Sequence, residues 1–133
     1  MEPYVAFTPD ILLDGDELHL DAYGVPGKLV PTLGHTQGST SVLLPSRDAL
    51  VGDLLASGIL IGGIARLGHA RRPPFEDDPQ AVSRSLFQLL DAGAERFYLG
   101  HGGILPAAEV RRHAHVLASL PPRLAMTPST LRA

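Results

Sequence analysis

The first half of the chain has short apolar runs, and the second half has helical periodicity. In the first half, runs of three to five residues alternate with turns rich in glycine, proline and aspartate. This pattern is typical of β-strands, and we expect strands over residues 28–32, 41–44 and 49–51. Residues 11–13 and 17–21 flank an Asp-Gly turn, which predicts a hairpin.

Two helices are predicted in the second half. Asp78 is a suitable N-cap, and Pro79 is a favourable first helical residue. This helix is expected to end at Gly93, and a second helix to begin after Pro106. The apolar faces are Val82, Leu86, Leu89 and Leu90 in the first helix and Val110, Ala114 and Leu117 in the second.

The remaining segments complete the predicted organisation. Residues 97–99 form a further short strand between the two helices. Residues 56–74 contain four glycines and no clear period, which predicts an irregular loop. We expect one domain over residues 1–120, followed by a loose tail over residues 121–133. The fold class is therefore α/β, with a mixed or mainly antiparallel sheet and helices on one face.

Composition and charge narrow the classes of function. The 133 residues are 44% hydrophobic and 19% charged, which is typical of a folded domain with a real core. The net charge is −3 and the basic residues are scattered, so no nucleic-acid partner is expected. The longest apolar run is too short to cross a bilayer, and the first residues lack a signal-peptide pattern. We therefore expect a soluble cytoplasmic protein without membrane contact.

Three candidate site residues each follow a glycine at the end of a predicted strand. They are His35, Asp53 and His101. Strand ends are rigid and glycine permits a sharp turn, so three such side chains can face one cleft. The chain has no cysteine, and two imidazoles with one carboxylate suit a divalent ion such as zinc. The alternative for each residue is a structural role in its turn.

The segments around these residues resemble the second half of the metallo-β-lactamase superfamily. The motifs are TLGHTQGS around His35, LVGDLL around Asp53 and YLGHGG around His101, in that order, and the resemblance covers about residues 9–117. It implies one half of an αββα sandwich. It also implies that His35 and His101 bind different zinc ions and that Asp53 bridges both and is the catalytic residue. The implied activity is hydrolysis of a small-molecule ester, thioester or lactone.

The sequence lacks one motif of that family. The pattern His-x-His-x-Asp-His, which supplies the other metal ligands, has no match. His113 and His115 are not followed by Asp-His, and they lie in a predicted helix. Residues two apart on a helix point about 200° apart, so these two cannot chelate one ion. Three ligands with water complete one tetrahedral site but not two, so zinc at partial occupancy is expected.

Three interpretations of the missing motif stay open. In the first, the chain is part of a truncated hydrolase whose metal motif lies on a missing N-terminal half. In the second, two copies form a homo-oligomer in which each covers the other's apolar sheet face. In the third, the chain is a degenerate, non-catalytic remnant that acts as a homodimeric binding or structural protein.

Two other histidines are expected to be unrelated to any site. His19 alternates with two leucines, which indicates the polar face of a strand. His69 stands beside two arginines and is expected in a solvated loop, with a role in binding an anionic substrate as the alternative.

Overall fold

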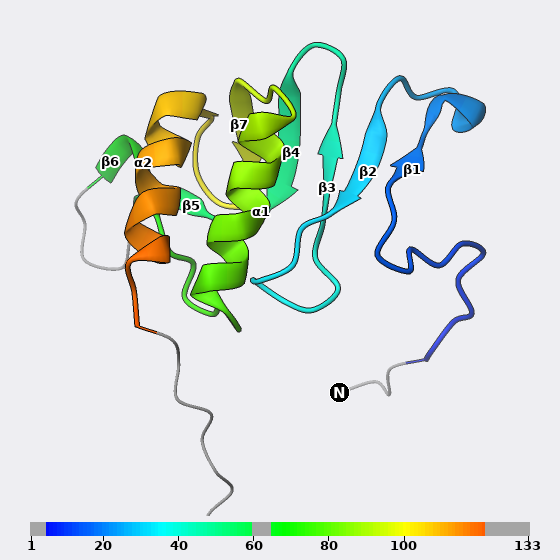
Figure 1. Cartoon of the computed structure of the whole chain (residues 1–133), viewed down its shortest axis with the longest axis horizontal. Coiled ribbons are helices and arrows are strands. Elements are labelled where there is room, and N and C mark those ends of the chain that lie inside the picture. The colour runs from blue at the N-terminus through cyan, green and yellow to red at the C-terminus, as the bar shows by residue number, and fades with distance from the viewer. Residues whose placement is uncertain (1–4, 60–64, 122–133) are drawn as a thin grey trace, which may run out of the picture.

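A computed structural model of the chain describes residues 5–59 and 65–121 (Figure 1). Within these residues, a six-stranded mixed sheet, a two-stranded ribbon and two α-helices form the structure. The sheet has the order β1-β2-β3-β4-β7-β8, with β1 at Leu18–His19, β2 at Lys28–Pro31, β3 at Thr40–Leu43, β4 at Asp48–Gly52, β7 at Arg96–Leu99 and β8 at Leu105–Pro106. The ribbon is β5 (Ala56–Ile59) with β6 (Ala65–Arg71), and the helices are α1 (Pro79–Asp91) and α2 (Ala107–Ala118).

The start of α1 confirms the predicted cap. The side chain of Asp78 accepts hydrogen bonds from the backbone N–H groups of Gln80 and Ala81, both at 3.0 Å. Pro79 is the first helical residue, where its missing N–H costs nothing. The positive φ of Gly93 ends the segment as expected.

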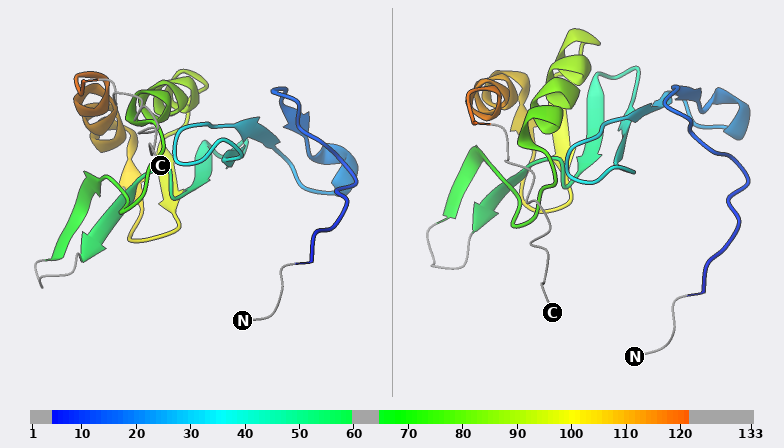
Figure 2. Two further views of the ribbon diagram at one scale, coloured as in Figure 1. Left: turned by 90° about the horizontal axis from the view of Figure 1, so that it is seen from below. Right: turned by 60° about the horizontal axis from the view of Figure 1, so that its bottom comes forward.

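Both helices lie on one face of the sheet, and their apolar stripes face the core (Figure 2). On the sheet, one registered row points toward the helices. Its members are Leu43, Ala49, Phe97 and Leu105, which are Cα partners in turn and are exposed by 8% or less. The α/β class with helices on one face is thereby confirmed.

The predicted hairpin around Asp14-Gly15-Asp16 is wrong. Residues 11–13 form no strand, and β1 pairs with β2 instead, with Leu18 opposite Leu29. A 3-10 turn at Asp21–Tyr23 closes this hairpin. The strand that pairs with β1 lies farther along the chain than predicted. This strand, β2, contains Leu29 and also pairs with β3, whereas residues 11–13 are not part of the sheet.

The predicted irregular loop over residues 56–74 is also wrong in its main part. Strands β5 and β6 pair antiparallel there, with Ser57 opposite Ala70. The register shifts between Ser57 and Gly58, and both Gly58 and Gly68 have positive φ. Such irregularities break the alternation of a regular strand, which explains why the sequence shows no period.

Two further predictions concern the ends and the membrane. The predicted tail lies outside the described residues except for Pro121, so the domain limit at residue 120 stays a prediction. No helix in the described parts of the chain is long and apolar enough to cross a membrane.

Candidate metal centre

Two of the candidate site residues lie in contact at one end of the sheet. Strands β4 and β7 are parallel neighbours, so their carboxyl ends meet at the same edge. Asp53 follows β4 and His101 follows β7, and the backbone N–H of Gly100 donates to the carbonyl of Gly52 at 2.8 Å. Nδ1 of His101 lies 2.6 Å from Oδ1 of Asp53. The tertiary structure therefore brings together two residues that the motifs indicated separately.

The glycines of the His101 loop are required by close packing. A Cβ atom at Gly100 would lie 2.5 Å from Oδ1 of Asp53, and one at Gly102 would lie 1.9 Å from the carbonyl oxygen of Ser57. Ser57 also binds this loop, because its backbone N–H donates to the carbonyl of His101 and its hydroxyl donates to the carbonyl of Gly103 at 2.9 Å. The ribbon thus supports the loop that carries His101.

The contact with Asp53 determines which nitrogen of His101 is free. A carboxylate oxygen that accepts from Nδ1 of a neutral His101 ring leaves the lone pair of that ring on Nε2. The side chain of His101 is 78% exposed, whereas that of Asp53 is 33% exposed. A carboxylate that orients an imidazole in this way is the common support of a metal-binding histidine.

His35 lies in a loop that is held against the start of α1. The backbone N–H groups of Asp78 and Asp77 donate to the carbonyls of Gly34 and His35, at 2.9 and 3.2 Å. Gly34 has φ +133°, and a Cβ atom there would lie 2.3 Å from the backbone nitrogen of Val82. Nδ1 of His35 is buried and has no hydrogen-bond partner among the described residues. A buried polar atom without a partner is costly, and a ligand would remove that cost.

These residues fit part of a metal site but not a complete one. Across residues 5–59 and 65–121, no three His, Asp or Glu side chains form a group able to hold a metal ion. His35 therefore does not complete a three-ligand group with Asp53 and His101 in this structure. A structural or catalytic zinc ion takes at least three protein ligands. The binding of one ion by all three residues stays a prediction.

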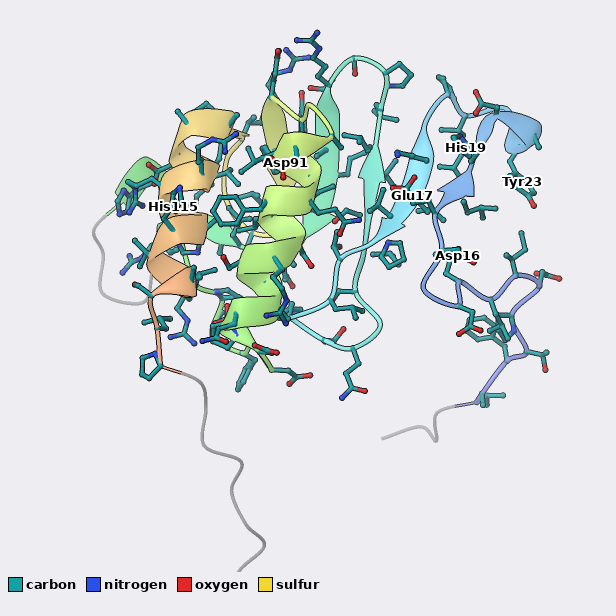
Figure 3. All side chains as sticks on the ribbon, viewed as in Figure 1. Asp16, Glu17, His19, Tyr23, Asp91 and His115 are labelled. Carbon is teal, nitrogen blue, oxygen red and sulfur yellow. The ribbon has the colours of Figure 1, made fainter. Side chains whose placement is uncertain are left out.

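The other histidines lie away from this pair. His19 is exposed on the edge strand β1, as expected (Figure 3). His113 is 5% exposed, whereas His115 is exposed and its ring makes a T-shaped contact with that of Phe87, so the two point to different sides of α2. His69 differs from the prediction of a solvated loop residue. It belongs to β6, and its Nδ1 lies 3.3 Å from Oε1 of Glu109.

Sequence reasoning missed the supporting roles of Ser57 and Glu109. The carboxylate of Glu109 accepts a hydrogen bond from the backbone N–H of Ala70 at 2.7 Å and two from Arg112, and so attaches the ribbon to α2. The contact of Ser57 with Gly103 joins residues 46 positions apart, and that of Ala70 with Glu109 joins residues 39 positions apart, which no local pattern signals.

A cavity of about 610 Å³ lies at the other end of the sheet. Its lining includes Lys28, Arg47 and Gly93. Arg47 precedes β4 whereas Asp53 follows it, so this cavity and the Asp53–His101 pair are at opposite ends of the strand. The cavity is not part of the candidate metal centre.

Comparison with solved structures shows which class of protein has this fold. The chain superimposes on a metallo-β-lactamase family protein of Thermus thermophilus with a TM-score of 0.51 and 28% identity, covering 84% of this chain and 35% of that one. It matches the DIM-1 metallo-β-lactamase with a TM-score of 0.52 and 26% identity, covering 79% and 46%. A metallo-β-lactamase of Pontibacter korlensis shares the fold with a TM-score of 0.54 at 16% identity, covering 86% and 51%.

The chain therefore has the fold of one half of a metallo-β-lactamase and resembles proteins of that superfamily. It spans between about a third and a half of the length of the solved proteins it matches. No protein-family model matches the chain, and no curated protein matches its sequence.

Proposed function

We propose that this chain forms one half of a metal-dependent hydrolase of the metallo-β-lactamase type. The observation that carries the proposal is the 2.6 Å contact between Asp53 and His101 at the adjoining ends of two parallel strands. This contact occupies Nδ1 of His101, whose side chain is 78% exposed, and leaves Nε2 of the neutral ring available to an ion. His35, with its buried and unpartnered Nδ1, is the third proposed ligand.

The chemistry of the donor set supports zinc. Bound zinc would lower the pKa of a coordinated water toward 7 and polarise a carbonyl oxygen. The roles of the protein are to hold the His101 ring in one tautomer through Asp53 and to keep the loop in place through Ser57. The proposed substrates are small-molecule esters, thioesters or lactones, on the strength of the resemblance.

The chain by itself is proposed to bind zinc only in part. The described residues bring two candidate ligands into contact and leave the third outside a common group. A full site would need further ligands from another polypeptide segment, as the coverage of about half of the matched proteins suggests. Sub-stoichiometric zinc in the isolated chain is therefore expected.

Metal analysis of purified protein tests this proposal. The chain is purified without chelator, dialysed against zinc and measured by inductively coupled plasma mass spectrometry. We expect less than one equivalent of zinc, reduced several-fold in His35→Ala and in His101→Ala. His19→Ala is the control, because His19 is an exposed histidine on the edge strand.

Two results would contradict the proposal. Zinc that is unchanged in His35→Ala and in His101→Ala would show that the ligands lie elsewhere. Zinc that falls equally in His19→Ala would show non-specific binding by surface histidines.

A second candidate function is a non-catalytic binding or structural role. The observation that favours it is the lack of a three-ligand group among the described residues. Hydrolysis of an ester, a thioester and a lactone in the presence of zinc distinguishes the two. Turnover above the rate of zinc in buffer that is lost in Asp53→Asn supports the hydrolase, and a wild-type rate no higher than that of zinc in buffer supports the non-catalytic role.

A further inference from the structure

The side chain of Glu109 joins α2 to β6, the ribbon strand that lies beside it (Figure 1). Its Oε1 accepts hydrogen bonds from the backbone N–H of Ala70 at 2.7 Å and from Nη2 of Arg112 at 2.6 Å, and its Oε2 accepts from Nε of Arg112 at 2.9 Å. Nδ1 of His69 lies 3.3 Å from the same Oε1. Because only 16% of the Glu109 side chain is exposed, the carboxylate has a fixed position between the helix and the ribbon.

Glu109 is ionised at neutral pH. Its hydrogen bonds with Arg112, opposed in part by burial, hold the pKa of Glu109 at about 2, and the hydrogen bond from Ala70 contributes to this. Hydrogen bonds to an ionised acceptor are stronger than those between neutral groups. The bond from Ala70 is therefore a strong constraint on the position of β6.

This bond is made where the ribbon is least regular. Ala70 is registered with Ser57, but the next registered pair is Arg66 with Gly58, so residues 67–69 have no counterpart on β5. A bulge of this kind interrupts the ladder and leaves backbone groups unpaired. Ala70 is only 3% exposed, so water has little access to its N–H, and loss of the carboxylate would leave that group unsatisfied. The ribbon therefore depends on Glu109 at this point.

Ser57, the registered partner of Ala70, is also the residue that binds the His101 loop. Its backbone N–H and its hydroxyl donate to the carbonyls of His101 and Gly103, on either side of Gly102. A Cβ atom at Gly102 would lie 1.9 Å from the carbonyl oxygen of Ser57, so the two backbones are in close contact. Closely packed groups transmit a displacement and do not absorb it. A shift of Ser57 therefore moves the loop.

We propose that Glu109 is a positioning residue for His101. Its carboxylate fixes Ala70, and the pairing of β6 with β5 carries this constraint to Ser57. Ser57 in turn sets the position of the loop in which the His101 ring meets Asp53. The proposal rests on the proposed function for its effect on zinc, whereas its effect on the His101 ring applies to the metal-free protein.

Nitrogen NMR of the imidazole rings in metal-free protein tests the proposal. At mildly alkaline pH, where histidine is neutral, the nitrogen shifts report which ring nitrogen carries the proton. In wild type we expect the proton of His101 on Nδ1, facing Asp53. In Glu109→Ala the share of rings protonated at Nδ1 should fall. The affinity for zinc, measured by competition with a chelating dye, should fall several-fold in the same variant.

Two variants separate the bond from Ala70 from more general effects. Glu109→Gln keeps a side-chain oxygen for the N–H of Ala70 but loses the charge, so it should resemble wild type more than Glu109→Ala does. Ser83→Ala removes the hydrogen bond from Ser83 to the carbonyl of Ala114, which joins the two helices, and should leave the His101 ring unchanged. Urea unfolding measures how much stability each variant loses.

A milder variant keeps the test decisive if Glu109→Ala does not fold. Glu109→Asp shortens the side chain by one methylene group, so it should change the His101 ring in the same direction but less. It should also speed hydrogen exchange at the N–H of Ser57, which donates to the His101 carbonyl.

The outcomes distinguish the positioning role from the metal site. A changed His101 ring in Glu109→Ala would support the positioning role even if wild type bound no zinc, a result that would reject the metal site alone. An unchanged ring in folded Glu109→Ala, or in Glu109→Asp where only that variant folds, would overturn the positioning role whether or not zinc binds. A change in Ser83→Ala or Glu109→Gln as large as that in Glu109→Ala would overturn it as well.

Discussion

Nδ1 of His101 lies 2.6 Å from Oδ1 of Asp53, although 48 residues separate them along the chain. Parallel pairing of β4 with β7 makes this contact, because both residues follow the carboxyl ends of these neighbouring strands. The contact needs room beside it, and Gly100 provides that room because it has no Cβ atom.

Gly100→Ala is expected to break the contact between Asp53 and His101. The added methyl would lie 2.5 Å from Oδ1 of Asp53, so the carboxylate must move away. In NMR spectra of the imidazole, the Nδ1–H signal of His101 should lose its hydrogen-bonded shift. Gly103→Ala is the control, because a Cβ atom there meets nothing within 4 Å. An unchanged His101 signal in Gly100→Ala would refute the packing argument.

Gly34→Ala is expected to destabilise the His35 loop strongly. Its φ of +133° disfavours alanine, and the new Cβ atom would lie 2.3 Å from the backbone nitrogen of Val82. We expect a loss of more than about 2 kcal/mol in the free energy of unfolding, measured with urea. Gly15→Ala, also at positive φ but with open space around it, should lose only about 1 kcal/mol. Equal losses would show that the contact with α1 contributes nothing.

Asp78→Ala should cost about 1 kcal/mol of stability, because it removes both side-chain hydrogen bonds to the first turn of α1. Asp77→Ala removes the same charge one residue earlier and should change stability by less than about 0.5 kcal/mol. Urea unfolding monitored by circular dichroism measures both. If the two variants lose the same stability, the negative charge near the start of α1, and not the side-chain cap of Asp78, stabilises the helix.

His113 is expected to make stability depend on pH. Burial, followed by the charge of Arg112, lowers the pKa of His113 to about 4, whereas the pKa of a histidine in the unfolded chain lies near 6.5. Between these values the unfolded chain binds more protons, so stability falls as pH decreases from 6.5 to 4 and not further below. The loss amounts to at most roughly 3 kcal/mol.

Urea unfolding at pH 7 and pH 4.5 measures this loss. His113→Gln should flatten the decrease, whereas His19→Gln, a change at an exposed histidine, should leave it unchanged. Glu109 affects stability at a lower pH than His113 does. Its hydrogen bonds with Arg112 hold its pKa at about 2, so its contribution is lost only as pH falls from 4.5 toward 2. If stability depended on pH in the same way in His113→Gln and in wild type, the loss between pH 6.5 and 4 would not come from His113.

The sequence by itself determined the features that depend on neighbouring residues. The start of α1 was predictable because the Asp78 cap reaches only two and three residues ahead. The inner strands β2, β3, β4 and β7 were predictable within about a residue, because each is a short apolar run between turns. The motifs around Asp53 and His101 indicated that a potential metal-binding side chain follows each of two strands.

Only the tertiary structure decided which of these pieces meet. Leu18 pairs with Leu29 instead of joining a hairpin with residues 11–13, and the ribbon forms in spite of its irregular register. Asp53 contacts His101 while His35 stays outside a common ligand group. Strand pairing and register depend on contacts between residues that are distant along the chain. Whether Leu50 faces the helices or the solvent likewise depends on which of its neighbours are buried on each side of the sheet. The local sequence preferences do not contain this information.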